Sequence, residues 1–280
     1  ISGVNIAIMS LAAPMASAND GHFRPIEVLT EPGTLFEPGP PSPIFLYGWP
    51  MQHVIDLIHR ALAEVWPGGV PAGSGGDVCA VTWWGEDADG EYWIDGGDHF
   101  VGQGATQSAD ADAPLMHVSC SGIRNMPAEV WEAKHPVLVE RFEFAADSAG
   151  AGQFRGGPGV DISYRVERQT RVCISWERTK TPPWGLAGGG CGRANSIAVL
   201  DPEGQRRPYT KVTDLELAAG SVVEMRTGGG GGHGPPPLRA AQAVAEDVAD
   251  GLVSEQAAAR DYPHAWPPAP ARPGVSPPNP

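Results

Sequence analysis

The segment 120–159, CSGIRNMPAEVWEAKHPVLVERFEFAADSAGAGQFRGGPG, carries the most closely spaced structural signals in this chain. Pro127 suits the first turn of a helix, where an amide has no helical partner, and Pro136 stops that helix. Residues 137–144 follow with β-branched and aromatic side chains that suit a half-buried strand. Five glycines between 150 and 159 mark a turn in which side chains would obstruct the backbone. The segment therefore predicts a buried corner made of a helix, a strand and a glycine-rich turn.

Composition excludes several classes of protein. The 280 residues include 37 Gly and 29 Pro, which predicts short elements joined by long ordered loops. A formal net charge of −14 argues against nucleic acid and against an anionic membrane surface, since both require clustered cations. The four cysteines form no Cys-x-x-Cys pair, so neither a zinc ribbon nor a disulfide scaffold is indicated. We expect a cytoplasmic protein with four buried thiols.

The remaining sequence predicts an α+β fold that becomes β-rich toward the C-terminus, with a few packed helices and many Gly/Pro loops. Residues 51–66 form the clearest helix, with an apolar stripe and with Asp56 on the opposite, polar face. A strand is expected at 26–30, and strands around an acidic hairpin turn are expected in 78–104. From residue 160 onward, side chains alternate between apolar and polar, which is the period of a strand with one wet face.

Asp98 and His99 are the first candidate catalytic residues, because an Asp-His pair flanked by glycines can line a tight loop against a ligand, with the carboxylate orienting the imidazole. Neighbouring side chains on a strand point to opposite faces, so both reach one site only where the glycines bend the chain. His117, on a strand-like run that leads into segment 120–159, is a further catalytic candidate.

Asn125 and Glu129 complete the catalytic candidates. Glu129 and Glu132 are three residues apart and share a helix face, as acid–base or metal-binding carboxylates would. The structural alternative is that Glu129 stabilises the positive end of the helix and that Glu132 pairs with a nearby cation. No set of side chains has the spacing of a metal centre, so we predict no metal ligand in this chain.

Substrate or phosphate binding is considered for three further residues. Asn19 and Arg24 could orient a carbonyl or a phosphate, since arginine is a fixed fork of donors and asparagine both donates and accepts. The alternative is a turn cap and a surface ion pair. Arg155, inside the glycine-rich turn, is the third candidate. Arg178 is expected to form a surface salt bridge.

Several motifs resemble one family. RNMPAEVWEAKHPVLVERFEF, then DSAGAGQFRGGPGV, resemble the signature of the hydantoinase B and 5-oxoprolinase subunits, which are related to acetone carboxylase subunits. PPWGLAGGGCG and TGGGGGHGPP resemble further glycine-rich family motifs, in which consecutive glycines let the backbone approach another surface. Met126 stands where the family usually has threonine, and Ala149 stands where it has glycine. The resemblance covers about nine-tenths of the chain.

The resemblance implies the C-terminal half of a B-type subunit of an ATP-dependent cyclic-amide hydrolase. A hydantoinase A-like partner would use ATP to phosphorylate the carbonyl oxygen of a hydantoin or 5-oxoproline-like lactam, within a hetero-oligomer. A divalent metal, zinc or manganese, would be held in the N-terminal half. The alternatives are an acetone-carboxylase-like subunit, in which ATP activates a ketone, and a non-catalytic β-rich interaction module.

This interpretation predicts a division of the chain. Residues 1–136 would continue a catalytic domain that is truncated at its N-terminus, since the uncharged start of the chain lacks the basic region of a secretory signal. Residues 137–234 would form a β-rich region and residues 235–262 a helical segment. The proline-rich residues 263–280 would be a disordered tail.

Overall fold

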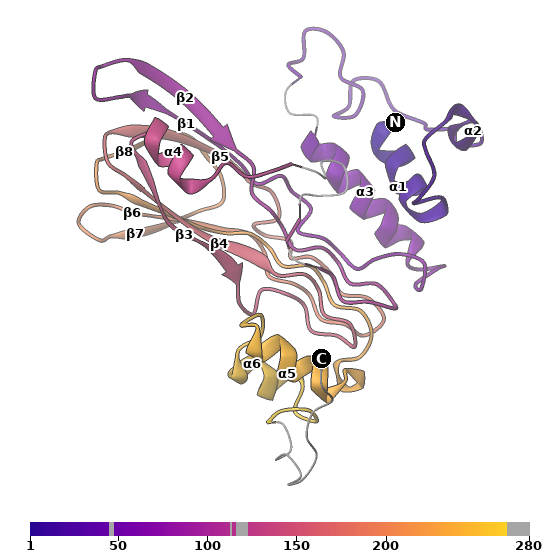
Figure 1. Ribbon diagram of the computed structural model, residues 1–280. Coiled ribbons are helices and arrows are strands. Elements are labelled where there is room, and N and C mark those ends of the chain that lie inside the picture. The colour runs from indigo at the N-terminus through magenta and orange to yellow at the C-terminus, as the bar shows by residue number, and fades with distance from the viewer. Residues whose placement is uncertain (45–47, 113, 116–122, 268–280) are drawn as a thin grey trace.

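The computed structural model describes residues 1–44, 48–112, 114–115 and 123–267, and it has the predicted α+β fold (Figure 1). Within these residues the helices are α1 (Ser2–Ala12), α2 (Asp20–Phe23), α3 (Gly48–Leu62), α4 (Ala128–Lys134), a 3-10 turn (Pro236–Leu238), α5 (Ala241–Ala249) and α6 (Glu255–Asp261). The strands are β1 (Ala80–Glu86), β2 (Tyr92–Gly97), β3 (Val137–Ala145), β4 (Gly159–Val166), β5 (Thr170–Ser175), β6 (Ser196–Leu200), β7 (Arg206–Tyr209), β8 (Val212–Leu217) and β9 (Val222–Arg226).

Two antiparallel sheets pack around one hydrophobic core. The first sheet has the strand order β2-β1-β5-β8 and the second has the order β3-β4-β9-β6-β7. Both sheets and α4 contribute buried side chains to this core, among them Val81, Trp83, Trp131, Val137, Ile162, Val172, Ile174, Val223 and Met225. Strands on both sides of residue 136 thus share one core. The division of the chain into four regions stays a prediction.

Strand β4 shows how the alternation in the sequence becomes packing. Val160, Ile162 and Val166 are buried in the core, as the period of two predicted. Their neighbour Asp161 is also buried, at 9% exposure, because β4 lies between β3 and β9 and because the Arg226 side chain pairs with this carboxylate. The face of β4 that was expected to contact solvent is therefore mostly buried.

Extended glycine-rich segments continue beyond the sheets and lie beneath α3 in Figure 1. Residues 228–232 are at their centre, and their backbone groups bond to several other segments. Gly230 N donates to Gly157 O at 2.8 Å, Gly231 N to Gly73 O at 2.8 Å, and Gly232 N to Gly190 O at 3.0 Å. We call residues 72–75, 102–105, 150–157, 185–192 and 228–232 the glycine bundle. This arrangement confirms that the glycines permit close backbone approach. The N–H groups of Gly230, Gly231 and Gly232 already donate to backbone carbonyls, so they are not free to bind an anion.

Helices lie at two ends of the glycine bundle. Helix α1 packs on α3, with Gly3 and Ala7 buried. Helices α5 and α6 form a small core of their own around Val244 and Tyr262. Asp247 of α5 ties them to the rest of the chain, because its carboxylate accepts from two buried guanidinium groups, those of Arg155 and Arg239.

Several sequence predictions are wrong. Residues 26–30 form no strand. Asp56 faces the interior instead of solvent, because Arg178 reaches it at 2.6 Å and neither side chain is more than 6% exposed. The expected surface salt bridge of Arg178 is thus a buried pair. The expectation of four buried thiols is wrong as well, because Cys79 is buried but Cys173 is half-buried and Cys191 is exposed. His117 and Cys120 lie outside the described residues, as does most of the proline-rich tail, 268–280.

Candidate functional site

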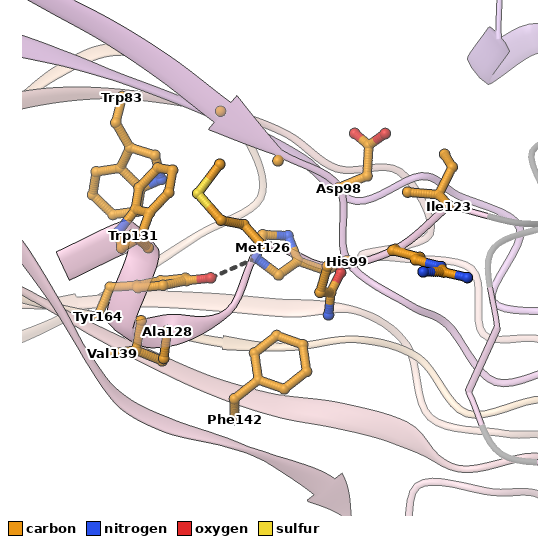
Figure 2. Close-up of a pocket in the computed structure, with 14 residues that line it drawn as sticks. Trp83, Asp98, His99, Ile123, Met126, Ala128, Trp131, Val139, Phe142 and Tyr164 are labelled. Atoms are coloured by element: carbon orange, nitrogen blue, oxygen red, sulfur yellow. Dashed lines mark hydrogen bonds between the residues drawn. The ribbon is translucent and has the colours of Figure 1, made fainter. Parts of the chain in front are cut away.

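A cavity of about 480 Å³ lies between the two sheets, next to α4 (Figure 2). Its walls come from the end of β2, from residues 98–99 and 123–126, and from inward side chains of β1, β3, β4 and α4. The lining residues are Trp83, Gly96, Gly97, Asp98, His99, Ile123, Arg124, Asn125, Met126, Ala128, Trp131, Val139, Phe142 and Tyr164. Most of this lining is apolar or aromatic, as is usual for a site that binds a small organic molecule.

Aromatic rings from four elements surround the cavity. Trp83 and Tyr164 meet edge to face, with ring centroids 5.5 Å apart, and Trp131 lies 6.3 Å from Tyr164. Phe142 stacks on His99 at 6.3 Å. These residues are close because alternate positions of β1, β3 and β4 point inward. The result is a largely aromatic wall, and the polar side chains in the lining are those of Asp98, His99, Arg124, Asn125 and Tyr164.

His99 is held by two hydrogen bonds, one from each ring nitrogen. Its Nδ1 lies 2.8 Å from the carbonyl oxygen of Cys79, and its Nε2 lies 3.0 Å from the hydroxyl oxygen of Tyr164. Burial lowers the pKa of the imidazole to about 4, and burial raises the pKa of the Tyr164 phenol above its usual value. Both groups are therefore neutral at physiological pH.

Cys79 has an unusual backbone conformation, with φ at +46°. A non-glycine residue in this left-handed region is strained, and such strain persists only where surrounding contacts impose it. Here the Asp77 carboxylate accepts from the amide of Cys79 at 3.1 Å, while the Cys79 carbonyl faces His99. The strained residue thus determines where the imidazole is anchored.

Asp98 does not orient the imidazole, contrary to the expectation from the sequence. Figure 2 shows its carboxylate directed away from the His99 ring, and the backbone of Cys79 anchors that ring instead. The carboxylate still lines the cavity, and partial burial raises its pKa. The two neighbours therefore reach the same cavity from different sides.

The other catalytic candidates divide between the cavity and the surface. Asn125 lines the cavity and is exposed at its mouth. Glu129 lies in the first turn of α4 and does not line the cavity. The Glu132 carboxylate accepts from the backbone amide of Val139 at 2.8 Å, so it joins α4 to β3 instead of pairing with a cation. His117 cannot be placed relative to the cavity, because it is outside the described residues.

The three candidates for substrate or phosphate binding lie outside this cavity. Asn19 caps α2 by accepting from the amide of Gly21 at 3.0 Å, and Arg24 pairs with Asp20 at 2.8 Å on the surface. These contacts are the turn cap and the surface ion pair that the sequence offered as the alternative to ligand binding. Arg155 is buried, with Nε donating to Asp247 at 2.9 Å. The structure therefore brings together Asp98, His99 and Asn125, and it leaves these three elsewhere.

Sequence reasoning missed the aromatic residues of the site. Trp83, Trp131, Phe142 and Tyr164 are separated by up to 81 positions, and each resembles an ordinary core residue of its own strand or helix. The signal in the sequence that could have found them is that Trp83, Phe142 and Tyr164 each lie on a strand, at a position that faces inward. Only the pairing of β3 with β4, and the packing of the two sheets, places them around one space.

Among the described residues, no group of three or more His, Cys, Asp or Glu side chains comes close enough to hold a metal ion. The described part of the chain therefore does not fit a divalent metal centre. In the same part of the chain, no helix has the length and apolar character needed to cross a membrane.

Comparison with known proteins identifies the family. The hydantoinase B/oxoprolinase family model matches residues 1–236. The chain belongs to the hydantoinase B/oxoprolinase family. The beta chain of a caprolactamase from Pseudomonas jessenii is 29% identical over 285 residues, which cover 94% of this chain and 47% of that protein. The B component of a putative D-/L-hydantoinase from a Pseudomonas species is 28% identical, over 87% of this chain and 41% of that protein. The chain thus spans about half the length of these curated relatives.

Solved structures agree with this assignment to the hydantoinase B/oxoprolinase family. The crystal structure of an ATP-dependent caprolactamase from Pseudomonas jessenii superimposes with a TM-score of 0.83 at 26% identity, covering 93% of this chain and 47% of that one. A nucleotide-free acetone carboxylase matches with a TM-score of 0.77 at 22% identity, covering 93% of this chain and 40% of that one. The second likeness shows a shared fold alone.

Proposed function

We propose that this chain is part of the B-type subunit of an ATP-dependent cyclic-amide hydrolase and that the cavity next to α4 holds the ring of the substrate. The observation that carries this proposal is an apolar, aromatic cavity of about 480 Å³ whose polar centre, the His99–Tyr164 pair, is neutral. This neutral pair suits an uncharged lactam or hydantoin ring, which needs no charged partner; the charged side chains of the lining are those of Asp98 and Arg124. Membership of the family supports the same substrate class.

The chemistry of an amide explains why ATP is used. Resonance makes the carbonyl carbon of a lactam a poor electrophile. Transfer of a phosphoryl group from ATP to the carbonyl oxygen, on a hydantoinase A-like partner, would release ADP and make the ring carbon a stronger electrophile. Water then adds to that carbon, a proton moves to the ring nitrogen, and the C–N bond breaks to leave an acyl phosphate. A second water hydrolyses the acyl phosphate to the carboxylate and inorganic phosphate. In this sequence the cavity holds the ring and excludes bulk water from it, which preserves the activated intermediate until attack.

The metal implied by the family is assigned to another part of the longer protein. The described residues do not fit a zinc or manganese centre. Within this proposal the present chain shapes the pocket and does not catalyse alone.

A partner surface is proposed next to the cavity. Large apolar side chains are exposed on β2, on residues 123–126 and on β3, namely Ile94, Ile123, Met126, Phe142 and Phe144. Exposed apolar side chains that gather into one patch usually mark an interaction site. We assign this face to contact with the ATP-binding partner in a cytoplasmic hetero-oligomer, where ATP is available.

The test uses the full-length protein together with its ATP-binding partner. Caprolactam, 5-oxoproline and hydantoin are supplied with ATP, and ADP and the ring-opened amino acid are measured. Val139→Trp, which fills the cavity, should abolish ring opening, whereas Tyr209→Phe, outside the cavity, should leave it intact. ATP use that requires bicarbonate and gives a carboxylated ketone would establish the carboxylase alternative instead. A complex that consumes no ATP with any of these compounds would support the interaction module.

A further inference from the structure

The hydrogen-bond chain through His99 has one defined direction. The Cys79 carbonyl oxygen can only accept, so the proton of the neutral imidazole is on Nδ1, 2.8 Å from that oxygen. Nε2 then carries a lone pair and must accept. The Tyr164 hydroxyl, 3.0 Å away, therefore donates its only proton to Nε2. This order directs the phenolic hydrogen toward Nε2 of the imidazole and away from the cavity.

Three features keep this direction from reversing at physiological pH. His99 is buried and its pKa is about 4, so Nε2 stays unprotonated. Tyr164 remains a phenol, since burial raises its pKa. Cys79 is held in its left-handed conformation by the carboxylate of Asp77, so its carbonyl keeps facing Nδ1. The polarity of the chain is thus determined by the fold.

The Tyr164 oxygen consequently presents only lone pairs to the cavity. Within the described residues, the sole hydrogen-bond partner of this oxygen is His99. The Tyr164 ring packs against the indoles of Trp83 and Trp131, with ring centroids 5.5 Å and 6.3 Å away. Figure 2 shows the hydroxyl directed into the space between Trp131, Met126 and His99. A ligand that fills this space meets an oxygen to which no described side chain donates a hydrogen bond.

We propose that the Tyr164 oxygen accepts a hydrogen bond from the N–H of a bound amide, so that the cavity selects secondary cyclic amides over tertiary amides and ketones. The identity of the ligand class rests on the proposed function. The selection itself rests on geometry: a ring without an N–H would leave the buried acceptor unpaired. That loss corresponds to about a 5- to 150-fold weaker affinity. Tyr164 is then the residue that distinguishes a lactam from a ketone of the same ring size.

The experiment measures binding by calorimetry in the full-length protein, without ATP. The three probes are caprolactam, N-methylcaprolactam and cycloheptanone, which have the same ring size. We expect caprolactam to bind about 5- to 150-fold more tightly than either of the others. Cycloheptanone controls for the extra bulk of the N-methyl group. Tyr164→Phe should reduce the preference for caprolactam severalfold, and so should His99→Phe, which frees the phenol to donate. Tyr209→Phe, on β7 and outside the cavity, should retain the full preference.

The outcomes separate the inference from the proposed function. Equal affinities for the three probes in the wild-type protein, or no binding of caprolactam, would overturn the inference whether or not the variants fold. A preference that survives unchanged in Tyr164→Phe would also overturn it. A preference for caprolactam that depends on Tyr164 would support it. If that preference is found but no ring opening occurs with ATP and the ATP-binding partner, the proposed function fails and the inference stands.

Discussion

Replacing Gly230 with alanine tests the packing of the glycine bundle. An added Cβ would lie 1.7 Å from the Gln103 oxygen and 2.8 Å from the Gly104 nitrogen, although Cβ contacts below 3.0 Å essentially never occur. Both atoms are backbone, so residues 228–232 would have to move by roughly 1.7 Å to restore an ordinary contact distance of 3.4 Å. Such a shift would break the 2.8 Å hydrogen bonds that Gly230 makes with Gly157 and with Gly150.

The expected loss follows from those two bonds. Each broken buried hydrogen bond costs about 1–3 kcal/mol, so the free energy of unfolding should fall by about 2–6 kcal/mol. For a chain of this size, that is a fall in Tm on the order of 10 °C. The assay is thermal and urea unfolding followed by circular dichroism.

Gly190→Ala is the matched control. Its Cβ would meet the Ala151 backbone at 3.4 Å and 3.5 Å, which is ordinary contact, and its φ lies outside the left-handed region. Both substitutions reduce the entropy of the unfolded chain equally, so the difference between them isolates the clash. We expect Gly190→Ala to change stability by less than about 1 kcal/mol. Equal Tm values for the two variants would refute the packing argument.

Three further predictions concern titration, thiol reactivity and the C-terminal helices. Burial lowers the pKa of His99 from 6.5 to about 4, so the neutral imidazole stabilises the fold above pH 6.5 and this contribution is lost as the pH falls through 4. Between pH 7 and pH 4, the free energy of unfolding measured in urea should fall by about 3 kcal/mol more for the wild type than for His99→Asn. Asp77, whose pKa burial raises, has the opposite effect on stability, but it contributes equally to both proteins. Equal falls in the two proteins would contradict this prediction. A thiol reagent should label exposed Cys191 in the native protein but label Cys79, whose pKa burial raises, only after unfolding; the reverse order would show that the burial is misassigned. Asp247→Asn should weaken two buried ion pairs and expose α5 and α6 to limited proteolysis, at a cost of about 3–5 kcal/mol; an unchanged cleavage pattern would mean that these pairs do not hold the helices.

Local patterns predicted much of the fold. Pro127 and Pro136 bound a helix that the structure places at Ala128–Lys134, and the strand expected at 137–144 is β3 (Val137–Ala145). These elements were predictable because proline geometry and side-chain shape act within a few residues. The acidic hairpin turn of 85–90 also joins β1 to β2 as expected.

Prediction failed where distant partners decide the environment of a residue. The helical periodicity of 51–66 places Asp56 on the face that was expected to contact solvent. Arg178, 122 positions away, nevertheless pairs with Asp56 in the interior. The candidate site shows the same limit. Asp98 and His99 were visible as a pair, but the anchor of the imidazole is the carbonyl of Cys79 and the hydroxyl of Tyr164.

The sequence by itself determined the family, the α+β class and the need for close backbone packing around the glycines, because motif residues and missing side chains are local properties. Only the tertiary structure decided that aromatic side chains of β1, β3, β4 and α4 enclose one cavity. It also decided the tautomer of His99 and hence the acceptor that Tyr164 presents. Hydrogen-bond direction depends on which groups meet in space, and strand pairing brings those groups together across long stretches of chain.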